Sequence, residues 1–153
     1  MPDARTLKSL PRLFFDQVEV HGTRKFIWNK IHNNWIGLTY NEVAQQIRDI
    51  ASGLIARGIN AGDRVVIISE NRLEWVVADL AVMAIGAISV PAFTSNTEND
   101  HLHILEDSGA VAVICSTKRL ASIAEGAAEK ASECRLMIMV EKSKTIHQPA
   151  GLA

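Results

Sequence analysis

Two short polar stretches, each directly after an apolar run, hold the side chains that are best placed to touch a ligand. Glu70 and Asn71 follow the run 64–69, and Thr94 and Ser95 follow the next apolar run along the chain. A carboxylate accepts hydrogen bonds, whereas amides and hydroxyls both donate and accept them. These four residues are candidates for the wall of a ligand site. For Asn71 and Ser95 we favour a second interpretation, in which each side chain caps a helix.

Motifs that would supply a catalyst or a phosphate-binding loop do not occur in the 153 residues. The nine glycines are never spaced as G-x-G, which excludes the dinucleotide-binding fingerprint. The phosphate-binding sequence GxxxxGK[ST] and the nucleophile sequence GxSxG do not occur either. We therefore assign no catalytic and no cofactor-binding residue in this chain.

Histidine and cysteine spacing argues against a metal site. His101 and His103 are two residues apart in a predicted helix, so their side chains point about 200° apart and cannot readily share an ion. At least one of them should face solvent. Cys115 and Cys134 fit neither a CxxC motif nor a zinc spacing. We predict no metal ligand.

The net charge and the hydropathy of the whole chain give no signal for several classes of partner. Sixteen Lys and Arg against 17 Asp and Glu give a net charge of −1, too balanced for a field that recruits nucleic acid or an anionic membrane. The longest low-charge stretch, 80–93, is shorter than the roughly 20 residues of a membrane-spanning helix. The first residues lack a secretory signal, so we expect a reduced, cytoplasmic chain.

Tryptophan is a candidate binding residue because it combines a large apolar ring with one hydrogen-bond donor. The chain has three, at positions 28, 35 and 75. We favour packing in or beside the core over a binding face for all three.

The first third of the chain predicts a helix, a hairpin and a second helix. Apolar spacing predicts a helix over 7–20 with Ser9 as a possible cap, and β-branched and aromatic runs predict a hairpin within 24–40. Thr39 and Glu42 fit the S/T-x-x-E capping box of a helix that ends near a glycine at position 58.

From residue 64 onward, strands and helices alternate. Continuously apolar strands that alternate with helices are typical of a parallel sheet covered on both faces. We therefore predict an α/β fold: a mainly parallel, doubly wound sheet flanked by helices on both faces, after an N-terminal helix and β-hairpin. The expected strands are 64–69, 87–93, 110–115 and 135–140, and the expected helices are 71–84, 97–108 and 120–131. Asn71 should cap the first of these helices. Ser95 and Glu98 should form the capping box of the second, which should end at Gly109.

We expect two regions of unequal size. Residues 1–143 form the α/β subdomain, and 144–153 are a polar tail or a truncation point.

Three segments, in this order, resemble the N-terminal part of the AMP-forming acyl-activating enzymes. They are "LTYNEV" (38–43), "EWVVADLAVMAIGAISVP" (74–91) and "HILEDSGAVAVICS" (103–116). Within that superfamily, the sequence is most similar to the long-chain fatty acyl-CoA ligases.

The resemblance implies a two-step ligase. A fatty acid and MgATP give an acyl-adenylate and pyrophosphate, and coenzyme A (CoA) then forms the thioester. The family's phosphate loop, adenylate-framing segment and lid lysine have no counterpart in this sequence. The chain therefore resembles a scaffold subdomain, and we expect it to bind no ATP, Mg²⁺ or CoA and to be inactive by itself.

The alternating pattern alone allows other functions. One is a stand-alone flavodoxin-like or receiver-like binding domain. Another is a structural, partner-binding module, which could self-associate through exposed core surface.

Overall fold

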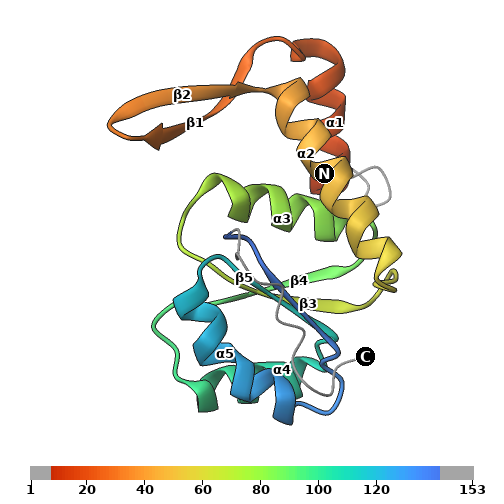
Figure 1. Ribbon diagram of the computed structural model, residues 1–153. Coiled ribbons are helices and arrows are strands. Elements are labelled where there is room, and N and C mark those ends of the chain that lie inside the picture. Colours follow the sequence, from red (N-terminus) through yellow and green to blue (C-terminus); the bar gives the residue numbers. More distant parts are fainter. Residues whose placement is uncertain (1–7, 142–153) are drawn as a thin grey trace, which may run out of the picture.

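The computed structural model describes residues 8–141, and the predicted tail over 144–153 lies outside the described residues. Five helices and six strands follow one another along the chain (Figure 1). In order they are α1 (Leu10–His21), β1 (Lys25–Ile31), β2 (Asn34–Thr39), α2 (Tyr40–Ala56), β3 (Arg64–Ile68), α3 (Leu73–Ala84), β4 (Ile88–Ala92), α4 (Glu98–Ser108), β5 (Ala112–Cys115), α5 (Lys118–Lys130) and β6 (Leu136–Met139).

The central sheet is parallel and has the strand order β4-β3-β5-β6. From β3 the chain passes through α3 to β4 at one side, whereas from β5 it passes through α5 to β6 at the other. Helix α3 covers one face of the sheet, and α4 and α5 cover the opposite face (Figure 1). The predicted doubly wound α/β fold is confirmed, and its topological switch point lies between β3 and β5.

Alternation along the strands builds a core on each face. Val66 and Ile68 of β3 pack with the apolar sides of α4 and α5, whereas Val65 and Ile67 pack with α3. A third cluster joins α1 and α2 to the outer side of α3. Because β3 is central and covered twice, its last four residues are fully buried, as its continuous apolar run predicts.

Strand β4 is less buried than predicted because it lies at the edge of the sheet. Ile88 is 50% exposed, and Pro91 is also exposed. The Ile88 N–H donates to the Asp63 carbonyl. Amide groups alternate in direction along a parallel strand, so the N–H that Pro91 lacks would have pointed outward. The proline therefore removes no ladder bond, and it obstructs pairing at this edge.

The predicted hairpin forms and projects beyond the packed helices (Figure 1). His32 and Asn33 connect its strands with φ angles of 45° and 67°, as a two-residue type I′ turn requires. Trp28 and Trp35 are 57% and 65% exposed, so the prediction that they pack in or beside the core is wrong. The ribbon is only two strands wide here and leaves one aromatic face open. Trp75, in α3, is half-buried.

The predicted caps of α1 and α2 are confirmed. Ser9 accepts a hydrogen bond from the Arg12 N–H, and Thr39 and Glu42 form a complete capping box. Gly58 follows α2 with φ +80°, and its N–H donates to the Ile55 carbonyl.

The predicted N-caps of the next two helices are wrong, whereas Gly109 ends α4 as predicted, with φ +58°. Arg72, not Asn71, is the N-cap of α3, and no side chain caps that end. Helix α4 begins after Thr97, which forms a capping box with Asp100. Ser95 lies two residues too early, in the turn that precedes the helix.

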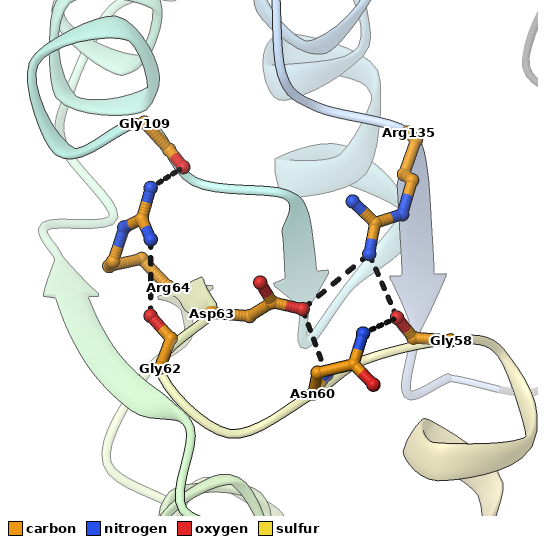
Figure 2. Close-up of polar contacts among 7 residues, drawn as sticks. All are labelled: Gly58, Asn60, Gly62, Asp63, Arg64, Gly109 and Arg135. Atoms are coloured by element: carbon orange, nitrogen blue, oxygen red, sulfur yellow. Dashed lines mark hydrogen bonds and ion pairs between the residues drawn. The ribbon is translucent and has the colours of Figure 1, made fainter.

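At the amino ends of the strands, two arginines tie loops to the sheet (Figure 2). Arg64 donates to the carbonyls of Ser108 and Gly109 at 2.7 and 2.6 Å, where α4 ends, and to the Gly62 carbonyl. Arg135 donates to the Gly58 carbonyl at 2.8 Å and lies 3.5 Å from Asp63. This edge is therefore occupied by structural contacts, which leaves the carboxyl edge for a ligand.

Candidate functional site at the carboxyl edge of the sheet

A side-chain hydrogen bond crosses the carboxyl edge at the switch point. Glu70 follows β3 and Ser116 follows β5, and the Ser116 hydroxyl donates to Glu70 Oε2 at 2.5 Å. The Ser116 N–H also donates to the Ile68 carbonyl, which fixes the serine against the end of β3. Ligands of open parallel sheets bind in the crevice at this position. The structure therefore places one predicted site residue, Glu70, at the expected point of the fold.

Glu70 is held as an anion. The hydrogen bond from Ser116 is the main cause that lowers the pKa of the Glu70 carboxyl, and Arg119 and Arg72 add smaller attractions. Arg119 Nη2 lies 3.9 Å from Glu70 Oε1. Ser116 is 1% exposed, whereas the Glu70 side chain is 45% exposed. Glu70 is thus an accessible carboxylate whose orientation is fixed by a buried hydroxyl.

An open hollow of about 580 Å³ lies between this edge and the hairpin. Its charges are mixed, because Lys30 and Arg72 lie among the carboxylates of Glu70 and Glu74. Arg72 is already engaged in two contacts with Glu74, at 2.8 and 3.2 Å. The full lining is Asn29, Lys30, His32, Glu70, Arg72, Glu74 and Thr117.

The other three predicted site residues do not join Glu70 in this hollow. Asn71 is exposed and lines a neighbouring hollow beside the hairpin. Thr94 and Ser95 lie in the turn after β4, where the Asn96 N–H donates to the Phe93 carbonyl at 3.3 Å. Their strand is on the far side of β3 from β5, so Glu70 meets Ser116 instead.

Sequence reasoning missed the residues after β5 and β6. Ser116 and Thr117 directly follow an apolar run, the same signal that pointed to Glu70. Glu141 follows β6 and accepts from the Lys118 N–H at 3.2 Å, so it closes the end of this edge. The signal that identifies them is a polar residue directly after an apolar strand.

The arrangement can hold a polar ligand but offers little for catalysis. Ser116 is buried, and its proton is committed to Glu70. Burial raises the pKa of the Cys115 thiol to about 12, so this thiol is not a nucleophile.

Among residues 8–141 no three His, Cys, Asp or Glu side chains gather as metal ligands. None of the helices described over these residues has the length and apolar character needed to cross a membrane.

Comparison with known families identifies the fold's relatives. The sequence profile of the AMP-binding enzyme family matches residues 14–150, nearly the whole chain. The chain belongs to the AMP-binding enzymes.

The relatives of this AMP-binding chain include ligases of long-chain fatty acids. It is 43% identical over 83 residues to the long-chain-fatty-acid–CoA ligase FadD15 of Mycobacterium tuberculosis, covering 54% of this chain and 14% of that protein. It is 30% identical over 144 residues to a chloroplastic long-chain-fatty-acid–[acyl-carrier-protein] ligase, AEE15, of Arabidopsis thaliana, covering 92% and 20%.

A solved relative has the same fold. The benzoate CoA ligase of Burkholderia xenovorans superposes with a TM-score of 0.72 at 25% identity, covering 86% of this chain and 26% of that one. This AMP-binding chain thus spans between a seventh and a fifth of the length of the two curated ligases.

Proposed function

We propose that the chain is the N-terminal α/β portion, over residues 1–143, of an AMP-forming long-chain-fatty-acid–CoA ligase, and that it is inactive alone. In that role the carboxyl edge forms one wall of the site where a fatty acid, ATP with Mg²⁺, and CoA react. The match of the AMP-binding enzyme family to residues 14–150 carries the ligase proposal. The contact between Glu70 and Ser116 supports the position of the wall, because it lies at the switch point of the sheet.

Inactivity follows from the chemistry that the edge lacks. Transfer of an adenylyl group needs cations and hydrogen-bond donors preorganised around the phosphates. Here the fixed carboxylate of Glu70 would repel a phosphate, and Arg72 is paired with Glu74. We therefore assign Glu70, Asn71, Thr94 and Ser95 to the site wall, with Ser116 as the residue that positions Glu70, and assign catalysis to none of them.

We place the chain in the cytoplasm. Cys115 and Cys134 are free and buried, as is typical of a reducing compartment.

The test is an assay of the purified chain with MgATP, CoA and palmitate. We expect no fatty-acid-dependent release of pyrophosphate and no acyl-CoA, with FadD15 under the same conditions as the positive control. Turnover by the 153-residue chain would refute its inactivity. The coding sequence downstream of residue 153 gives an independent check, because we expect it to encode the family's phosphate loop and lid lysine.

A receiver-like domain is the second candidate, since strands β3 to β6 have the relative order of flavodoxin-like sheets. Such a domain needs clustered acidic residues at the carboxyl edge, where Glu70 is joined by a serine. Phosphorylation of the chain by acetyl phosphate with Mg²⁺ would favour this candidate over the ligase.

A further inference from the structure

The hairpin of β1 and β2 carries only basic charges. Residues 22–39 include Arg24, Lys25 and Lys30 and contain no Asp or Glu. All three basic side chains are exposed. Lys25 donates to the Gly37 carbonyl and lies 3.9 Å from Glu42, whereas Lys30 has no carboxylate partner among the described residues. The hairpin is therefore locally cationic, although the whole chain has a net charge of −1.

Large apolar side chains are exposed on both faces of this ribbon. Trp28 and Trp35 share one face, because Trp28 is opposite Gly37 and Trp35 is opposite Lys30. The Trp28 ring lies over Gly37, where an added Cβ would approach it to 3.0 Å. Ile36 points to the other face and is 45% exposed.

The aromatic face extends toward α3. Trp28 and Trp35 line, with Trp75, an open hollow of about 470 Å³ between the hairpin and the start of α3. Lys30 Nζ lies 5.9 Å from the centroid of the Trp35 ring, so a cation stands beside the aromatic surface. The hairpin thus combines amphipathic aromatic rings with basic groups on a segment that projects from the body (Figure 1).

We propose that this hairpin docks on the surface of an anionic lipid bilayer. Tryptophan is enriched at membrane interfaces, where its ring lies among the headgroups, and basic side chains beside it attract anionic lipids. An acidic protein would cover one face of the ribbon, whereas lipid surrounds an inserted ribbon and can bury both Trp35 and Ile36. The inference goes beyond the proposed ligase function and does not depend on it.

The experiment measures co-sedimentation of the chain with vesicles of phosphatidylcholine containing about one third phosphatidylglycerol. We expect binding to these vesicles, weaker binding at high salt, and little binding to phosphatidylcholine alone. Lys30→Glu should lower the partition coefficient at least about fivefold. Trp28→Ser with Trp35→Ser should lower it about tenfold and abolish the blue shift of tryptophan fluorescence, although Trp75 remains.

Two control variants separate the hairpin from general surface effects. Phe93→Ser removes a ring that is 80% exposed on the loop after β4. Lys118→Glu, on α5, makes the same change of charge as Lys30→Glu does on the hairpin. Both should bind vesicles within about twofold of the parent chain. Circular dichroism verifies that each variant is folded.

Three outcomes would overturn the proposal. One is no binding to the anionic vesicles, and another is equal loss of binding in the hairpin and control variants. The third is a dimer in solution that the two tryptophan substitutions dissociate, because a second copy of the chain would then cover the hairpin.

Discussion

At the scale of single residues, His101 is the side chain with the clearest measurable consequence. It is 1% exposed in α4, and neither ring nitrogen has a hydrogen-bond partner among the described residues. Burial therefore lowers the pKa of His101, and the neighbouring Asp100 only partly opposes this effect. The charged side chains of the adjoining α5 are exposed, and β4 carries none. The His101 side chain is therefore held as a neutral imidazole in the folded chain.

This residue should make stability depend on pH. The unfolded chain binds a proton at His101 below about pH 6.5, whereas the folded chain resists it to lower pH. Protonation of His101 therefore has no effect on the free energy of unfolding at pH values well above about 6.5. Below that pH it lowers the free energy of unfolding by up to about 1.4 kcal/mol per pH unit. Urea unfolding at neutral and mildly acidic pH should show that His101→Leu reduces the loss. His103→Gln, which changes an exposed residue, is the control, and an equal effect of both variants would refute the role of His101.

At the scale of elements, the Arg64 guanidinium joins the start of β3 to the end of α4 (Figure 2). The carbonyls of Ser108 and Gly109 are at the negative end of the helix dipole and face one cation. Gly109 adopts φ +58°, which turns the chain from α4 toward β5. The long crossover from β4 to β5 therefore depends on a contact across 45 residues.

Arg64→Ala should lower the free energy of unfolding by about 2–3 kcal/mol, since hydrogen bonds from a charged group are lost and partly buried carbonyls are left unpaired. Arg135→Ala removes a more exposed contact with Gly58 and Asp63 and should cost at most about 1 kcal/mol. Chemical denaturation of the two variants gives the comparison. If both variants lose a similar free energy of unfolding, the Arg64 contact does not stabilise the fold more than the Arg135 contact does.

At the scale of the whole molecule, several large apolar side chains of the described residues are exposed. Two of them, Ile88 and Phe93, lie on and just after the edge strand β4, and they are 50% and 80% exposed. Exposed large apolar side chains beside an edge strand can form an interface between copies of a chain. The remaining large apolar residues of this kind are Leu10, Leu13, Val20, Trp28, Trp35, Ile36, Ile50 and Ile55.

We therefore predict that the isolated chain self-associates through the β4 edge. Pro91 obstructs pairing of strands there, so the contact should depend on side chains and not on an extended sheet. Ile88→Ser with Phe93→Ser should weaken association about tenfold, measured by sedimentation equilibrium, and change stability by about 0.5 kcal/mol or less. A parent chain that stays monomeric at high concentration would contradict this prediction.

The local features of this fold could be predicted from the sequence because they depend on neighbouring residues. The Thr39–Glu42 capping box, the left-handed Gly58 and the turn at His32 and Asn33 each lie within a few residues of their partners. The apolar runs predicted a covered parallel sheet for the same reason. Capping of α4 was harder, because the pattern of a hydroxyl residue followed three positions later by an acid occurs at both Ser95 and Thr97.

Strand order decided the rest. Glu70 and Ser116 are separated by 46 positions in the sequence. They meet because β5 lies next to β3 in the sheet, so the residues that follow these two strands are neighbours. The exposure of Trp28 and Trp35 depends on how far the hairpin projects from the helices. The elements and the family could be predicted from the amino-acid sequence, since periodicity and short motifs are local. Which strand ends share a site and which aromatic faces stay open could not, because contacts between distant segments set them.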